Sequence, residues 1–174
     1  MGIGGSVQTG LKYAFTGGCD YAVQVDGDGQ HNPKFIPGLL KIADNGYDLV
    51  IGSRFIKKSH YQGTLFRNLG NNIFSWLIQW TCNQKIYDST SGFRVFNRKA
   101  MAFLIHHYPI DFPEPESIVK LFKNGFKIKE VAVEMKQRQA GESSVSRIKA
   151  IYLMLSISLA ILIEAIKKPV KYAN

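Results

Sequence analysis

The stretch from Tyr21 to His31 reads YAVQVDGDGQH and indicates how the chain is organised. Its first five residues are typical of a buried strand. The run ends abruptly in Asp and Gly, which are poor in sheets and favour turns. Asp26 and Asp28 therefore follow the carboxyl end of a strand, where open α/β sheets bind their ligands. Alternate residues at a strand end can point the same way, so both carboxylates can bind one hard cation, with Gln30 as a neutral oxygen ligand.

Other interpretations of the acidic turn compete with a metal site. Asp-Gly is a common turn dipeptide, so a polar turn without any ligand stays open. An EF-hand loop needs Glu at its twelfth position, but counting from Asp26 reaches Pro37. A dinucleotide-binding loop needs G-x-G-x-x-G, and the run from Gly27 lacks the third glycine. What remains is a D-x-D turn suited to Mg2+ or Mn2+ bound to a diphosphate.

The composition fits one globular domain with an anionic partner. The chain has 174 residues, of which 45% are hydrophobic, and its net charge is +9. A membrane surface, a nucleic acid or a phosphorylated substrate would match that charge. The basic residues are spread along the chain without an RNA-binding motif, which argues against nucleic acid. Cys19 and Cys82 lack metal-ligand spacing and suggest a reducing compartment.

The rest of the chain alternates between helical and strand patterns. A buried strand over 48–54 places Arg54 at its end, where its fork of donors suits a phosphate or a surface ion pair. A strand is also expected at 95–96 and a half-exposed edge strand at 127–135. We expect helices over 2–14, 33–45, 65–81, 98–107 and 146–168, with another ending at Gly125. The apolar stripe of 65–81, which includes Leu69 and Trp80, is expected to lie in the core, and a membrane-facing share of the stripe is the alternative.

The last helix divides the chain into residues 1–145 and a C-terminal segment, 146–174. Its apolar run of about 14 residues is shorter than the roughly 20 that span a bilayer. Basic residues flank the run on both sides. This pattern favours an amphipathic helix that lies in the membrane interface or docks on a membrane protein. Burial against its own domain is equally compatible with the pattern.

Taken together, several segments make the chain resemble family 2 glycosyltransferases, in the branch of dolichyl-phosphate mannose synthase and bacterial polyprenyl-phosphate sugar transferases. The resemblance covers essentially the whole chain. It rests on GIGGSVQTGL (2–11), VDGDGQHNP (25–33), IGSRF (51–55), Arg67, DSTSGFRVFNR (88–98), PEPES (113–117) and EVAVEMKQRQAGESS (130–144).

The resemblance implies roles for the metal-binding turn and for the arginines. Asp26 and Asp28, helped by Gln30, would hold Mg2+ or Mn2+ on the diphosphate of a nucleotide-sugar donor. Arg54 and Arg67 would face the phosphate of the acceptor.

Further roles are implied for the later motifs. Four residues of the segment 88–94 would line the sugar and acceptor cleft, namely Asp88, Ser91, Gly92 and Arg94. Glu116 aligns with an acidic residue that is the general base in many relatives, although a positioning role stays open. A family loop with the pattern R-x-x-G-x-S closes over the donor diphosphate, and it is matched by Arg138, Gly141 and Ser143.

The resemblance also implies the fold, the reaction and the location. The expected fold is α/β of the GT-A type, with a mostly parallel sheet that lacks its first strand–helix units. Those units, which hold the base and ribose, would precede Gly2, so the chain is expected to be N-terminally truncated. The expected activity is inverting sugar transfer to a polyprenyl- or dolichyl-phosphate-type lipid in cell-envelope glycan synthesis, peripherally at the cytoplasmic membrane face. The alternatives are a non-catalytic remnant acting as a subunit or fragment and, for assembly, a homo-oligomer.

Overall fold

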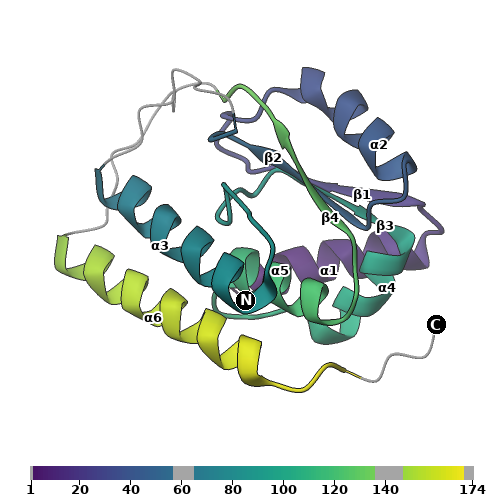
Figure 1. Cartoon of the computed structure of the whole chain (residues 1–174). Coiled ribbons are helices and arrows are strands. Elements are labelled where there is room, and N and C mark those ends of the chain that lie inside the picture. Colours follow the sequence, from purple (N-terminus) through teal and green to yellow (C-terminus); the bar gives the residue numbers. More distant parts are fainter. Residues whose placement is uncertain (1, 57–64, 136–146, 171–174) are drawn as a thin grey trace.

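Figure 1 shows a computed structural model that describes residues 2–56, 65–135 and 147–170. The expected order of helices and strands is confirmed, with boundaries shifted by a few residues. The elements are α1 (Ile3–Thr16), β1 (Tyr21–Gln24), the short 3-10 helix η1 (Pro33–Phe35), α2 (Ile36–Asp44), β2 (Leu49–Ser53), α3 (Leu65–Cys82), β3 (Arg94–Asn97), α4 (Arg98–His107), α5 (Pro113–Lys123), β4 (Ile128–Ala132) and α6 (Arg147–Ile166).

The four described strands form one sheet in the order β1-β3-β2-β4. β3 is antiparallel to both of its neighbours, whereas β2 and β4 are parallel. Three strands therefore run in the same direction and β3 runs against them, which confirms the α/β class. Arg94, the first residue of β3, pairs with Gln24 at the end of β1 and with Ile51 in β2. This register brings the ends of β1 and β2 and the segment before β3 to the same rim of the sheet.

Helices cover both faces of the sheet (Figure 1). On one face, α2 packs on Val50, Phe93 and Val95 in a small apolar cluster. On the other face, α1, α4 and α5 enclose a larger core that includes Leu49 and Phe96. Neighbouring strand residues therefore pack into different clusters, as the alternation of side chains along a strand requires.

β1 is less buried than the sequence pattern predicted. The prediction of a buried strand is wrong here, because β1 lies at an edge of the described sheet. Its residues are mostly half-buried, and Val23 and Val25 are exposed.

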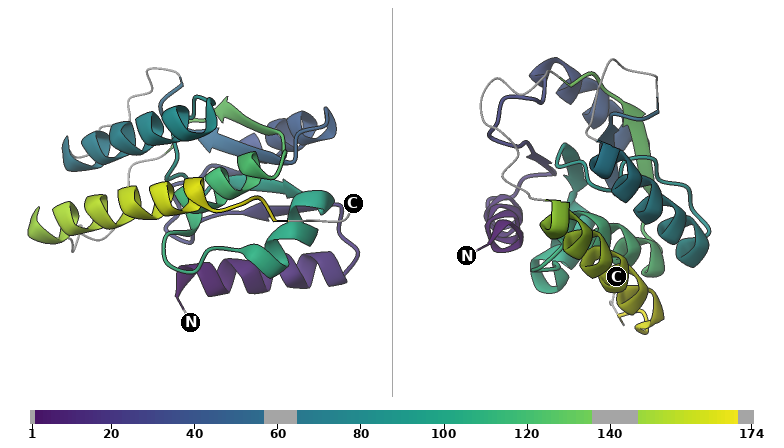
Figure 2. Two further views of the ribbon diagram at one scale, coloured as in Figure 1. Left: turned by 60° about the horizontal axis from the view of Figure 1, so that its bottom comes forward. Right: turned by 90° about the vertical axis from the view of Figure 1, so that its left-hand side faces the viewer.

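Helices α3 and α6 lie side by side (Figure 2). Both carry exposed apolar residues. Within α3, Phe74, Leu77 and Ile78 are buried as predicted, but Leu69 and Trp80 are exposed, so the core prediction is wrong for those two residues. α6 lies within the predicted range 146–168, but its apolar window is longer than the run of about 14 residues expected from the sequence, so the expectation that this segment is too short to span a bilayer is wrong by length and composition. Among the described residues, it is the one helix whose length and composition would allow it to cross a membrane, with a mean hydropathy of 1.9 over Lys149–Ile166 and 11% of that window buried.

We expect Phe96→Ala to destabilise the protein strongly, because Phe96 is fully buried on the central strand β3. The lost contacts and the remaining cavity should lower the free energy of unfolding by about 3–5 kcal/mol. Urea denaturation measures this change. Tyr13→Ala is the control, since Tyr13 is exposed on α1 and its loss should cost no more than about 0.5 kcal/mol. Equal effects of the two substitutions would contradict the described core.

Candidate functional site

Polar residues from three segments gather at the rim where β1 and β2 end. Arg54 directly follows β2, and the acidic turn follows β1. Residues 87–93 lead into β3, whose first residue pairs with both strands. Strand direction and register together therefore assemble segments that lie far apart in the sequence.

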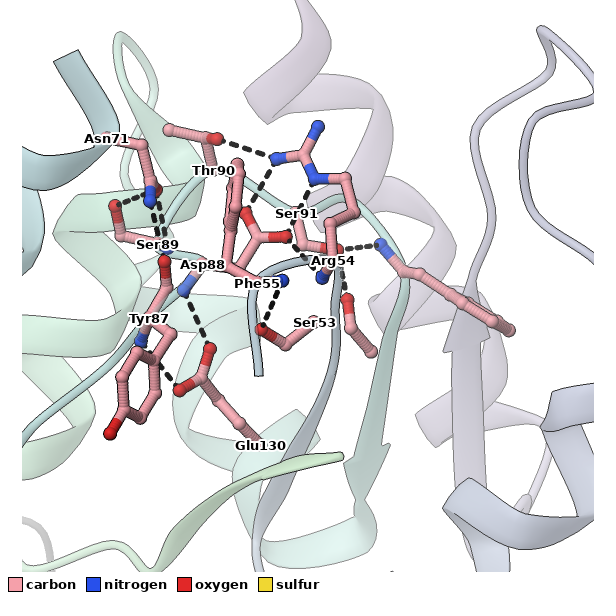
Figure 3. A network of polar contacts seen from close by, with 12 residues as sticks. Ser53, Arg54, Phe55, Asn71, Tyr87, Asp88, Ser89, Thr90, Ser91 and Glu130 are labelled. Carbon is pink, nitrogen blue, oxygen red and sulfur yellow. Dashed lines mark hydrogen bonds and ion pairs between the residues drawn. The ribbon is translucent and has the colours of Figure 1, made fainter. Parts of the chain in front are cut away.

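Arg54 and Asp88 form a buried, bidentate ion pair at this rim (Figure 3). The guanidinium donates from Nε to Asp88 Oδ2 at 2.7 Å and from Nη2 to Oδ1 at 2.6 Å. The Arg54 amide also donates to Oδ2, at 2.9 Å, and Nη2 donates to the Thr90 hydroxyl at 3.0 Å. Of the two predictions for Arg54, the ion pair is what the structure shows, although in the interior rather than on the surface. Contact with a phosphate stays a prediction.

Glu130 of β4 holds the backbone on which Asp88 sits. Its carboxylate accepts hydrogen bonds from the amides of Tyr87 and Asp88, each at 2.7 Å (Figure 3). Burial raises the pKa of Glu130, and the two amide hydrogen bonds oppose that rise. Sequence reasoning missed this residue, because the alternation along 127–135 placed it on the exposed side of an edge strand. Its partners lie more than 40 residues away, so no local signal marked it.

Further polar contacts fix the rest of the segment 87–94. Asn71 of α3 accepts from the Ser89 amide at 3.2 Å and donates to the Tyr87 carbonyl at 2.6 Å. The Ser91 hydroxyl donates to the Gly52 carbonyl at 2.7 Å. Arg94 is fully buried and donates to the carbonyls of residues 89, 91 and 114 and to the Ser117 hydroxyl. Ser91 and Arg94 therefore hold the loop together from inside.

Gly92 lies directly against the carboxylate of Asp26. A Cβ atom on Gly92 would come within 2.4 Å of Asp26 Oδ1 and 2.6 Å of Oδ2, so only glycine permits this approach. The Asp26 side chain is half-exposed. On its other side, Oδ2 lies 3.0 Å from Nε2 of the buried His31. This hydrogen bond lowers the pKa of Asp26, and partial burial opposes the effect.

The other two predicted metal ligands lie in the same turn. Asp28 Oδ1 accepts a hydrogen bond from the Gln30 amide at 3.1 Å, which closes an Asx turn. Over the described ranges, no group of three or more His, Cys, Asp or Glu side chains is placed to hold a metal ion. Mg2+ commonly takes one or two carboxylates and completes its shell with water and substrate phosphates. The residues present are therefore of the kind that a metal arriving with a diphosphate would use, and the half-exposed Asp26 carboxylate among them lies against Gly92.

Glu116 has its described contacts in other parts of the structure. Glu116 accepts from the Phe112 amide at 3.1 Å, near the start of α5. Burial raises the pKa of Glu116, and the charged groups that influence it are Glu164, Lys120 and Lys167. Lys120 belongs to α5, Glu164 belongs to α6, and Lys167 directly follows α6. None of the three is part of the acidic turn.

The Arg67 side chain and the R-x-x-G-x-S loop lie outside the described part of the chain. Arg67 lies in the first turn of α3, and its side chain is outside the described part. Arg138, Gly141 and Ser143 also lie outside the described residues.

A family model and several curated proteins are similar to this chain in sequence. Residues 1–104 match the model for Glycosyl transferase family 2. An uncharacterized protein of Methanocaldococcus jannaschii is 32% identical over 137 residues, which cover 76% of this chain and 56% of that protein. UDP-N-acetylglucosamine–dolichyl-phosphate N-acetylglucosaminyltransferase of Methanococcus voltae is 31% identical over 137 residues, covering 76% of this chain and 55% of the relative. Polyprenol monophosphomannose synthase of Mycolicibacterium smegmatis is 27% identical over 158 residues, covering 83% and 56%. The chain thus spans about half the length of these curated relatives.

We expect Asp88→Asn to destabilise the protein by about 3–5 kcal/mol, because it leaves the buried Arg54 guanidinium without its counter-charge. Chemical denaturation measures the loss. Glu134→Gln is the matched control, since its ion pair with Lys34 is exposed and should contribute at most about 1 kcal/mol. If Asp88→Asn changed stability no more than the control, the buried pair would not hold the rim.

Proposed function

The chain belongs to glycosyltransferase family 2, and on this basis we propose that it transfers a sugar from a nucleotide-sugar to a polyprenyl- or dolichyl-phosphate acceptor. Relatives named for dolichyl-phosphate and polyprenol acceptors support the acceptor class. The structural observation that carries the proposal is the rim itself, where the acidic turn, Arg54 and the glycine of segment 87–93 meet. An enzyme that brings two phosphate groups together needs such a mixture of carboxylates for a metal and cations for phosphate.

On the donor side, Asp26 and Asp28 with Gln30 would hold Mg2+ or Mn2+. The metal supplies positive charge that offsets the charge developing on the leaving diphosphate. Gly92 supports this assignment, because a glycine lets the backbone lie directly against the Asp26 carboxylate and limits the positions that the carboxylate can take. In the proposed loop, Arg138 adds a second positive charge over the diphosphate, with Gly141 and Ser143 as neighbours in the motif.

On the acceptor side, an oxygen of the lipid phosphate forms a bond to the anomeric carbon as the bond from that carbon to the donor diphosphate breaks. A single in-line displacement of this kind inverts the anomeric centre. Arg54 and Arg67 would hold the acceptor phosphate. Asp88 occupies the Nε–Nη2 edge of the Arg54 guanidinium and would fix the direction of that side chain.

The reaction needs little help from a general base, since a phosphate is already an anionic nucleophile. Both oxygens of Asp88 accept hydrogen bonds from Arg54, and Glu116 lies beside the charges of α5 and α6. We therefore assign positioning roles to Asp88 and Glu116 rather than proton transfer.

The surface of α3 and α6 suits a membrane interface. Trp76 and Trp80 stack on each other on the outside of α3, with their rings 6.2 Å apart. Outward-facing Tyr152, Leu155 and Leu159 continue the apolar surface on α6. Aromatic and aliphatic side chains with lysines at the helix ends are typical of helices that lie at a lipid surface. We propose that the protein lies peripherally at the cytoplasmic face of the membrane, where lipid-phosphate acceptors are held.

Titration calorimetry with UDP- and GDP-sugars in the presence of Mn2+ tests the donor site. We expect binding of at least one donor, weakened at least about tenfold in Asp26→Ala and in Asp28→Ala, since even the outer neighbours of metal ligands contribute that much. Asp20→Ala is the control, because Asp20 is an exposed carboxylate just before β1. Failure of the unmodified chain to bind any donor at millimolar concentration would favour the non-catalytic alternative.

Co-sedimentation with vesicles of phosphatidylcholine and phosphatidylglycerol tests the membrane surface. Replacing Trp76 and Trp80 together by Ser should weaken vesicle binding at least about tenfold, because losing burial worth about 1.5 kcal/mol already corresponds to that factor. Tyr13→Ser removes an equally exposed aromatic side chain from α1 and should leave binding unchanged. An equal loss in both variants would show that these tryptophans are not the contact.

A further inference from the structure

His31 is a buried residue at the rim for which sequence reasoning assigned no role. Its side chain is 3% exposed, and its Nε2 lies 3.0 Å from Asp26 Oδ2. Over the described part of the chain, its other ring nitrogen, Nδ1, is buried without a hydrogen-bond partner. The contact with Asp26 is therefore the polar contact that explains a histidine at this position.

The chemistry of the partner determines which ring nitrogen carries the proton. A carboxylate oxygen accepts hydrogen bonds, so an Nε2–H group facing it is attractive. The opposite neutral tautomer would place the Nε2 lone pair against the carboxylate oxygen, which is repulsive. His31 therefore donates from Nε2 to Asp26.

The surroundings of His31 hold the ring in place. The imidazole packs on Phe93, with the ring centres 4.9 Å apart. The backbone of His31 forms an antiparallel bridge with Met135, just after β4. The ring is buried and packed on Phe93, and the backbone that carries it is paired with Met135. The Nε2 donor that faces Asp26 therefore has a fixed position.

The carboxylate of Asp26 is thus confined from two directions. Gly92 lies against both of its oxygens, and His31 binds Oδ2. A half-exposed aspartate in a glycine-rich turn would otherwise sample several side-chain rotamers. Confinement removes that freedom before any ligand binds, which is how the neighbours of metal ligands raise affinity.

We propose that His31 is a positioning residue that fixes the Asp26 carboxylate in the orientation required to bind a divalent metal ion. This inference rests on the proposed function, in which Asp26 is a metal ligand. It concerns the hydrogen bond from Nε2 and assigns His31 no contact with the donor or the acceptor.

The test measures Mn2+ binding by the loss of the free-ion paramagnetic resonance signal, with UDP present, alongside the melting temperature of each variant. His31→Leu retains the apolar bulk without the donor and should raise the Mn2+ dissociation constant about 10–100-fold. His31→Gln places an amide donor near the original Nε2 and should recover most of the affinity. Lys34→Gln is the matched control, because Lys34 lies in the same segment but forms an exposed ion pair, and it should bind Mn2+ as the unmodified chain does.

Asp26→Ala separates failure of this inference from failure of the proposed function. If Asp26→Ala binds Mn2+ as the unmodified chain does, the proposed metal site is wrong, and the inference fails with it. If Asp26→Ala loses binding while His31→Leu keeps it, the metal site stands and the positioning role is overturned. Equal losses in His31→Leu and His31→Gln at unchanged melting temperature would also overturn it. Should His31→Leu not fold, His31→Asn replaces it, because its shorter side chain holds the amide donor away from Oδ2.

Discussion

The arrangement of the rim depends on the buried ion pair between Arg54 and Asp88. A carboxylate that is 0% exposed requires a counter-charge and hydrogen bonds, because removing a charge from water is costly unless both are supplied. Arg54 supplies the charge with two parallel hydrogen bonds, and Glu130 fixes the backbone of Asp88. Such a pair adds little net stability compared with apolar packing, but it tolerates only one geometry. It thereby fixes the conformation of the segment that ends at Gly92.

That fixed segment links the charge pair to the acidic turn. Gly92 can lie against Asp26 only if residues 88–91 hold it there, and they are held from β2, α3 and β3. The position of the proposed metal ligand Asp26 consequently depends on the same segment that contains Asp88, the partner of Arg54. The sheet makes this possible, because β3 runs against β1 and β2 and so begins where they end. A net charge of +9 adds a general attraction for phosphorylated substrates and anionic lipid surfaces.

Local patterns in the sequence predicted much of this structure. The acidic turn after an apolar run placed Asp26 at the rim, and a second apolar run did the same for Arg54. Local patterns did not reveal that β3 is antiparallel, because this depends on pairing between residues 21–24 and 94–97. They also missed Glu130 and His31, whose roles come from distant partners rather than from their neighbours. The exposed Leu69 and Trp80 of α3 have a related cause, since a hydrophobic stripe does not state whether protein or lipid covers it.

The central claim is that a divalent metal binds at Asp26 beside Gly92. Nuclear magnetic resonance of the 15N-labelled chain with UDP and trace Mn2+ tests it directly, because the paramagnetic ion broadens nearby amide signals with a steep dependence on distance. We predict that the amides of Asp26, Asp28 and Gly92 lose intensity first, while those of Ala100 and Leu104, buried in α4, keep theirs. Broadening centred elsewhere, with the Gly92 amide unaffected, would contradict the account.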